Sequence, residues 1–340
     1  MLKETFSTRA EEPRPLAGVL YVVRLLRLSF AIGRPVETAF RPHTVSLPPL
    51  LAFSMMLDRV FPIPYSAFVH NQFLTIAYCS NPLLRQSMLE VRHIYKSFGG
   101  IMAVYDCSLT VNKGSITGLI GPNGAGKTTL FNVITGHYKP DRGQIIFQGQ
   151  EIGGLPPHRI FHKKIYRTFQ ITREFGQMTV LENLMIMPEA QAGEQVWNTW
   201  FRPASVRTQE HKIKERALEV LDFVELLDLK DEYAGSLSGG QKKLLELARS
   251  MMAEPEMILL DEPGAGVNPT LMGKLTINIM KLRDEKEITF FLIEHDMDLV
   301  MSLCDQVIVM SEGRKLVEGP PETIKKDERV LEAYLGGQYR

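Results

Sequence analysis

The chain has 340 residues, of which 44% are hydrophobic and 23% charged, a composition that can bury a large core and leaves room for two domains. Its 39 basic and 39 acidic side chains cancel to a formal net charge of zero, so charge gives no indication of a nucleic-acid partner. Cys79, Cys107 and Cys304 match neither a zinc pattern nor an even disulfide framework, which favours a reducing compartment with Cys107 and Cys304 as small packing residues.

Residues 1–87 differ in composition from the rest of the chain. They contain a single lysine and a single aspartate, whereas arginine and proline are frequent and proline interrupts the apolar runs. The stretch 16–33 contains two arginines and the stretch 60–84 contains three prolines, so neither resembles a spanning helix of about 20 apolar residues. We interpret 1–87 as an atypical extension, either disordered or placed before the natural start at Met88, with a membrane-associating extension as the alternative.

Residues 89–134 predict antiparallel β-structure followed by a phosphate-binding loop. Apolar positions recur at short spacing around a turn at 98–100, and an apolar run typical of a short buried strand follows at 115–120. The sequence at 121–129 then matches G-x-x-x-x-G-K-[ST] and leads into a helix-like run. Because both the spacing and the strand-loop-helix context fit, a nucleotide site is favoured over a simple glycine-rich turn.

The residue types of this loop suit a nucleoside triphosphate. Glycines lack the Cβ atoms that would keep backbone N–H groups away from phosphate oxygens, and the following helix N-terminus adds favourable partial charge. Lys127 is expected to reach the β- and γ-phosphates, Thr128 to ligate Mg²⁺ and Thr129 to donate to a phosphate oxygen. The predicted loop residues are Gly121, Asn123, Gly124, Gly126, Lys127, Thr128 and Thr129.

Residues 171–250 show helical periodicity and no convincing strand, which predicts a helical subdomain inserted into the core. Within it, 237–241 reads Leu-Ser-Gly-Gly-Gln ahead of an amphipathic helix. A serine hydroxyl and two glycine amides before a helix N-terminus can form an anion-binding nest. Taken alone, the same residues would be better interpreted as an N-cap with a flexible entry.

Two later apolar strands end in polar groups. The run at 256–260 is typical of a buried parallel strand that presents Asp261 and Glu262 at its carboxyl end, where ligands bind in open α/β sheets. Asp261 is expected to hold Mg²⁺ through water, and Glu262 to act as general base on the attacking water. The run at 290–294 ends at His295, and beyond it we expect a hairpin around 311–314 and a closing helix at 323–334.

Taken in this order, the motifs resemble those of the ATP-binding-cassette (ABC) superfamily, over about residues 88–338. The resemblance implies an α/β P-loop NTPase at 88–340, with a mostly parallel core sheet, an antiparallel β subdomain and the inserted helical subdomain. It also implies that the signature of one subunit closes on the ATP held by another, so that a dimer encloses two ATP molecules. The signature residues are Ser238, Gly239, Gly240 and Gln241.

The resemblance implies further roles position by position. It implies that Phe98 stacks on adenine and that Gln170 senses Mg²⁺ and water and couples the site to a membrane partner. It implies that His295 contacts the γ-phosphate and helps orient the general base. Residues 264–269 stand in the place of the dimer-contacting D-loop, but Asn268 replaces the usual aspartate, which loses a charge and keeps a hydrogen-bond acceptor.

The segments between the motifs are similar to the ATPase subunits of bacterial branched-chain amino-acid importers, and the stretch 196–201 favours the longer paralogue. This similarity implies ATP hydrolysis that powers import of branched-chain or related amino acids from the cytoplasmic face of the cell membrane. The implied partners are a second ATPase subunit, identical or paralogous, two permease subunits and an extracytoplasmic binding protein. The alternatives are an ATPase of a lipid or lipopolysaccharide exporter and a soluble, non-transport ABC ATPase.

Overall fold

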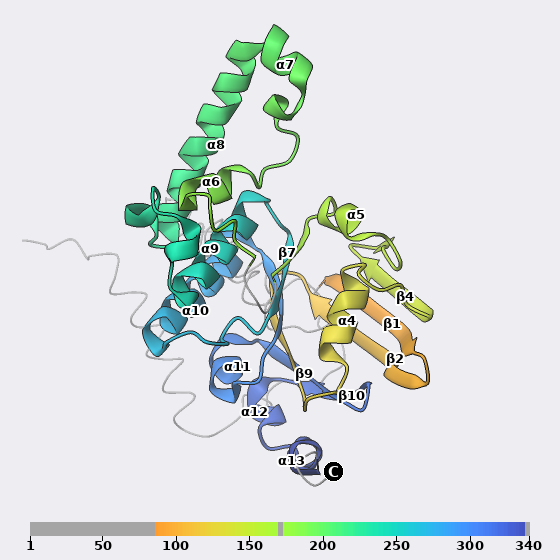
Figure 1. Ribbon diagram of the computed structural model, residues 1–340. Coiled ribbons are helices and arrows are strands. Elements are labelled where there is room, and N and C mark those ends of the chain that lie inside the picture. Colours follow the sequence, from red (N-terminus) through yellow and green to blue (C-terminus); the bar gives the residue numbers. More distant parts are fainter. Residues whose placement is uncertain (1–85, 169–172, 337–340) are drawn as a thin grey trace, which may run out of the picture. The chain divides into compact units, whose positions relative to one another are not determined.

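The computed structural model describes residues 86–168 and 173–336 of the chain (Figure 1). The predicted extension therefore lies almost entirely outside the described residues, and so does Gln170. Among the residues that are described, no helix is both long and apolar enough to cross a membrane.

The core is a six-stranded sheet in the order β10-β9-β3-β8-β7-β6. All neighbouring pairs are parallel except the β9-β10 hairpin. Every residue of β3, β7 and β8 is buried, as expected for parallel strands covered on both faces. Their carboxyl ends therefore share one edge of the sheet. The strands are β3 (Ile116–Ile120), β6 (Ile165–Arg167), β7 (Met257–Asp261), β8 (Thr289–Ile293), β9 (Gln306–Ser311) and β10 (Arg314–Gly319).

Each face of this sheet belongs to a separate hydrophobic core. Successive side chains of a strand point to opposite faces, so Phe290 packs in one core and Phe291 in the other. The first core is covered by α9 (Gly239–Met252), α10 (Pro269–Lys286) and α11 (Met297–Leu303). In the second, the rings of Phe131 and Phe291 lie 4.9 Å apart.

An antiparallel four-stranded sheet in the order β2-β1-β4-β5 closes the second core. Helix α4 lies between the two sheets, with Leu130, Phe131, Val133 and Ile134 buried there (Figure 1). Cys107 on β2 and Cys304 after α11 are buried free thiols, and burial raises the pKa of each to about 12. The elements are β1 (Ser87–Phe98), β2 (Ile101–Asn112), α4 (Lys127–Ile134), β4 (Arg142–Phe147), β5 (Gln150–Glu151) and α5 (Pro157–Phe161).

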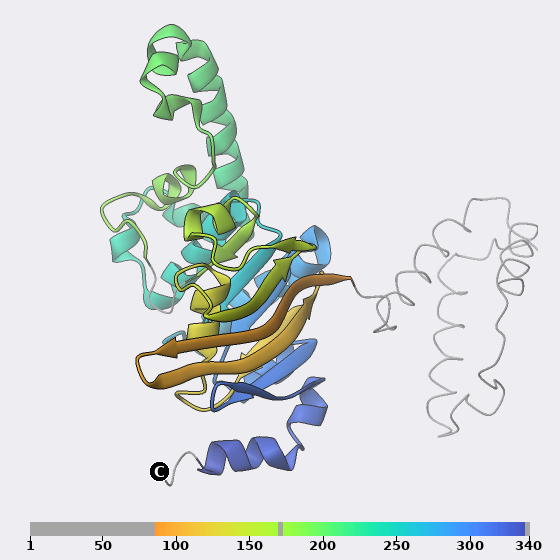
Figure 2. The same ribbon diagram turned by 90° about the vertical axis from the view of Figure 1, so that its right-hand side faces the viewer.

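The segment between β6 and β7 is helical over its described residues. Its longest helix, α8, has 21 residues and carries α7 at its outer end, away from both sheets in the two views (Figures 1 and 2). Within this segment, the α-helices that precede α9 are α6 (Val180–Met185), α7 (Val196–Phe201) and α8 (Pro203–Phe223). The segment also contains the 3₁₀ turns η3 (Ala192–Glu194), η4 (Leu227–Leu229) and η5 (Ala234–Ser236).

The C-terminal segment corrects one prediction. The single closing helix expected at 323–334 is two helices, α12 (Pro321–Ile324) and α13 (Glu328–Gly336). Asp327 separates them, because its Oδ1 accepts a hydrogen bond from the Arg329 amide at 3.0 Å and its carbonyl accepts from the Val330 amide at 3.0 Å. These bonds start a new helix in place of continuing the old one.

Candidate nucleotide-binding site

The loop between β3 and α4 has a backbone shape that requires glycine. Gly121, Gly124 and Gly126 have φ angles of 147°, 81° and 92°. A Cβ on Gly121 would lie 2.1 Å from the Met310 carbonyl oxygen, and one on Gly126 would lie 2.3 Å from that of Ala103. A Cβ on Gly124 would meet nothing within 4 Å, so this side of the loop is open. The packed side of the loop therefore fixes its shape and the open side is left for a ligand.

Lys127, the first residue of α4, is buried against its own loop. Its Nζ donates to the carbonyl oxygens of Gly121 at 2.7 Å and Pro122 at 3.0 Å. Burial lowers the pKa of Lys127, while the carboxylates of Glu262 and Asp261 act in the opposite direction. The loop that leads to Lys127 follows β3, and the two carboxylates lie at the end of β7, so all three groups are at the carboxyl edge of the parallel sheet.

Asp261, the last residue of β7, forms a buried ion pair that the sequence analysis did not assign. Its Oδ2 accepts from Nη2 of Arg167 at 2.8 Å, and both side chains are only 7% exposed. The Nη1 of Arg167 donates to Asn132 Oδ1 at 2.6 Å and to Thr135 Oγ1 at 3.1 Å, both next to or within α4. Arg167 thus joins β6, β7 and the helix of the phosphate loop. The signal for this role in the sequence is the charge of Arg167 at the end of a short strand.

Glu262 and His295 lie together beyond the ends of β7 and β8. His295 Nε2 is 2.8 Å from Glu262 Oε1. Glu262 has a φ angle of 51°, and its amide donates to the Ile293 carbonyl at 3.0 Å. Glu294, which the sequence analysis did not assign, is buried and accepts from the Gly264 amide at 2.7 Å and the His295 amide at 3.0 Å. The two turns are therefore fixed to each other by a buried carboxylate.

The residues present fit a magnesium ion. Thr128 follows Lys127 in the first turn of α4 and is exposed, and Asp261 ends β7 of the same sheet. A hydroxyl and a carboxylate oxygen are hard ligands of the kind that Mg²⁺ takes from proteins, the rest coming from phosphate and water. Thr128 and Asp261 would hold the ion. Gln170, predicted as a third contributor, lies outside the described residues.

The signature residues form the start of α9. Ser238 is the N-cap, with its Oγ accepting from the Gln241 amide at 3.4 Å while its own amide donates to Gln241 Oε1 at 2.9 Å. A Cβ on Gly240 would lie 2.4 Å from Leu271 Cδ1 of α10, so close helix packing requires this glycine. Ser238 and Gly239 are exposed. The N-cap interpretation thus describes the local structure, and the anion-binding role of Ser238 and Gly239 stays a prediction.

Phe98 and Asn268 also occupy defined positions. Phe98 ends β1 with its side chain 43% exposed, and its ring packs edge-on against Tyr138 with centroids 5.0 Å apart. The Nζ of Lys96 lies 5.4 Å from the same ring. Asn268 is the N-cap of α10, because its Oδ1 accepts from the Leu271 amide at 2.9 Å. The acceptor that Asn268 keeps is thus used within the chain.

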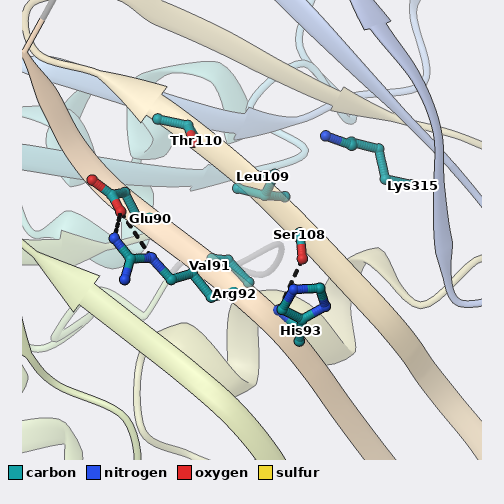
Figure 3. Close-up of a pocket in the computed structure, with 8 residues that line it drawn as sticks. All are labelled: Glu90, Val91, Arg92, His93, Ser108, Leu109, Thr110 and Lys315. Atoms are coloured by element: carbon teal, nitrogen blue, oxygen red, sulfur yellow. Dashed lines mark hydrogen bonds and ion pairs between the residues drawn. The ribbon is translucent and has the colours of Figure 1, made fainter.

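A pocket of about 250 Å³ lies away from these groups, beside β1, β2 and β10 (Figure 3). Glu90 and Arg92 are hydrogen-bonded on one side of it at 3.0 Å, and the His93 amide donates to Ser108 Oγ at 2.8 Å. Lys315 enters from the opposite side (Figure 3). No predicted nucleotide residue lines this pocket, so the phosphate loop and its neighbours define the candidate site.

A glycine-shaped phosphate loop, a strand-terminal aspartate and a glutamate-histidine pair at one sheet edge define a P-loop ATPase cassette. The family model of ABC transporters matches residues 104–265, and that of the branched-chain amino acid ATP-binding cassette transporters matches residues 314–340. The chain is 42% identical to the high-affinity branched-chain amino acid transport ATP-binding protein BraF of Pseudomonas aeruginosa, over 74% of this chain and 99% of that protein. It is 40% identical to LivG of Escherichia coli K12 over the same shares.

Solved structures give the same result. A nucleotide-free ATP-binding cassette from an ABC transporter superposes with a TM-score of 0.64 at 40% identity, covering 73% of this chain and 98% of that one. The ADP conformation of MJ1267, an ATP-binding cassette of an ABC transporter, gives a TM-score of 0.64 at 39% identity, covering 74% and 99%. The chain therefore belongs to the ABC transporter family, in the branch of the branched-chain amino acid ATP-binding subunits. The predicted fold class and family are confirmed.

Proposed function

We propose that this chain binds and hydrolyses ATP to power import of branched-chain or related amino acids through separate membrane subunits. The observation that carries the proposal is that the phosphate loop with Lys127 follows β3 and that Asp261 and Glu262 lie at the carboxyl end of the parallel strand β7, in a chain 42% identical to BraF. BraF is by name a high-affinity branched-chain amino acid transport protein.

Binding begins at the loop. The open side around Gly124 offers backbone amides to phosphate oxygens, and Thr129 adds a hydroxyl. Lys127 exchanges the carbonyls of Gly121 and Pro122 for the β- and γ-phosphates, which is favourable because a charged acceptor binds an ammonium more strongly than a neutral carbonyl. Phe98 supplies an exposed aromatic face for adenine. Thr128 and Asp261 would hold Mg²⁺, which would supply positive charge to neutralise the phosphates when bound.

Hydrolysis depends on Glu262 and His295. Glu262 accepts the proton of the attacking water, and His295 restrains the carboxylate through the 2.8 Å contact while its exposed ring edge reaches toward the γ-phosphate. The φ angle of 51° at Glu262 is maintained by the hydrogen bond that its backbone amide donates to the Ile293 carbonyl. The base is thus positioned before substrate arrives, which lowers the cost of organising the transition state.

The active site is completed by a second ATPase subunit. Helix α9 packs in the first core and α4 in the second, so the signature helix and the helix of the phosphate loop cover opposite faces of the core sheet (Figure 1). Ser238 and Gly239 of the signature are exposed, so they can close on the γ-phosphate held by another subunit. The partner is a second copy or a paralogous ATPase. Two permease subunits and an extracytoplasmic binding protein complete the importer, with this chain peripheral at the cytoplasmic face.

The experiment is reconstitution of the full chain with its membrane subunits and binding protein in proteoliposomes. ATP turnover is measured with leucine, isoleucine or valine, and with a basic amino acid as the control ligand. Stimulation by the branched-chain set alone supports the proposal, and the complex carrying Glu262→Gln supplies the background rate. Stimulation by lipid, with no response to any amino acid, would instead identify an exporter ATPase.

A further inference from the structure

Helix α7 presents large apolar side chains to solvent. Val196 and Trp197 are each 73% exposed, Trp200 is 79% exposed and Phe201 is 71% exposed. Trp197 and Phe201 stack with ring centroids 5.8 Å apart and planes at 14°. Spacings of one and four residues place all four on one side of the helix. We call these four residues the aromatic tip.

The aromatic tip is held by an ordered support. Val206 on α8 is buried, and the Ala192 amide donates to Gln209 Oε1 at 2.7 Å, which joins the chain before α7 to α8. Gln191 Nε2 also donates to the Met185 carbonyl at 2.8 Å. Helix α8 spans about 30 Å at 21 residues, and α7 sits at its outer end (Figures 1 and 2). The tip is therefore presented at a fixed place, away from the nucleotide residues.

The charges around the tip identify the surface that it fits. Residues 195–209, between Glu194 and Glu210, contain no aspartate or glutamate and include Arg202 and Arg207. Segments that lie at membrane interfaces combine tryptophan and phenylalanine with arginine. Their indole rings lie at the level of the headgroups, and their cations contact anionic lipid. A convex helix with exposed rings also suits a fluid layer that closes around it, since no groove has to match its shape.

We infer that the aromatic tip docks in the headgroup layer of an anionic bilayer, beside the membrane subunits. The inference builds on the proposed function, because that function places the chain at a membrane surface. It adds a direct lipid contact made by this chain, separate from its contacts with permease subunits. Docking at this point orients the ATPase relative to the bilayer independently of nucleotide.

The chain supplies its own probe for this inference. Its only two tryptophans are Trp197 and Trp200, so intrinsic tryptophan fluorescence reports the tip alone in the full chain. Vesicles of phosphatidylcholine with phosphatidylglycerol should shift the emission to the blue, and brominated lipid should quench it. Phosphatidylcholine alone should give a smaller shift, and added salt should weaken the response to the anionic vesicles.

Variants make the assay specific. Phe201→Ser keeps both reporters and should weaken vesicle binding about tenfold or more, since burying a phenylalanine side chain contributes about 1.5 to 3 kcal/mol. Ile277→Ser on α10, where the isoleucine is 53% exposed, is the matched control and should bind as the parent does. Both variants should hydrolyse ATP at the parent rate in the absence of vesicles. This separates failure of docking from failure of the proposed ATPase function.

Three results would overturn the inference. If neither vesicle shifts the emission but proteoliposomes holding the membrane subunits do, the tip contacts protein and not lipid. If acrylamide fails to quench the tryptophans of the full chain without vesicles, the tip is already covered by another part of the chain or by a second copy. A blue shift that is insensitive to Phe201→Ser would count against the tip as well.

Discussion

Glu262 is positioned without help from a ligand, through His295 on one side and the Ile293 carbonyl on its amide. We predict that Glu262→Gln binds ATP within a few-fold of the parent affinity, because the side chain keeps its size and its hydrogen-bonding oxygen. Turnover should fall by about 10²- to 10⁴-fold, because an amide cannot accept the proton of the attacking water. Nucleotide binding by equilibrium titration and phosphate release by the reconstituted complex measure the two effects.

Lys127→Ala provides the contrasting variant. It removes the ammonium that should reach the β- and γ-phosphates, so ATP affinity itself should drop and the same titration should show it. The fold should persist, because within the described residues the Lys127 ammonium donates to carbonyl oxygens of its own loop and does not join separate elements. For the earlier variant, Glu262→Gln, phosphate release at nearly the parent rate would show that Glu262 is not the general base.

Arg167 is the residue whose loss should cost most stability in this site. Arg167→Met leaves Asp261 as a buried carboxylate without its guanidinium, and removing one partner of a buried ion pair destabilises by about 3–5 kcal/mol. Chemical denaturation of the full chain, followed by far-UV circular dichroism, measures the change. The double variant Arg167→Met with Asp261→Asn should recover part of it. If the single and double variants unfold alike, the ion pair is not the source of the effect.

Helix α9 carries the element-scale prediction. Ser238→Arg should leave ATP binding by the isolated chain nearly normal, because the nest belongs to the site of another subunit. The bulky side chain should block closure and abolish cooperative ATP hydrolysis. Ser238→Ala is the matched control, because it loses the same N-cap bond, worth about 1 kcal/mol, and adds no bulk. Cooperative hydrolysis that survives in Ser238→Arg would contradict a site completed in trans.

The elements that sequence predicted best are those with one dominant physical signal. Strands β3, β7 and β8 are buried on both faces and so appear as unbroken apolar runs. The break between α12 and α13 was missed, because a single Asp327 side chain makes it inside an otherwise helical pattern. The Arg167 to Asp261 pair was missed because its partners lie 94 positions apart, and only the pairing of β6 with β7 brings them together.

For the molecule as a whole, the cassette should not need the first 87 residues. The matched segment covers 99% of BraF with 74% of this chain. A chain starting at Met88 loses the pairing of Ser87 with Asn112 and the bond from the Lys113 amide to the Gln86 carbonyl. Its melting temperature should fall by no more than about 2–4 °C, with ATP hydrolysis and complex assembly unchanged.

A chain starting at Gln86 keeps both interactions and is the control for this truncation. Differential scanning calorimetry and co-purification with the membrane subunits measure the two properties. A melting temperature lowered far beyond this range in both chains, or loss of membrane association, would show that the first residues are an integral anchoring or folding element.

The central sheet also determines how motion can pass through the molecule. Phe290 and Phe291 anchor opposite cores, so β8 cannot shift without disturbing both packings at once. Amide hydrogens of β3, β7 and β8 should therefore exchange only through global unfolding, while those of α7 exchange through local opening. The three strands thus form a rigid base for the site. Any movement that ATP causes at the sheet edge should therefore appear as a displacement of the helical region, because the strands that end in the site residues are packed on both faces and cannot shift.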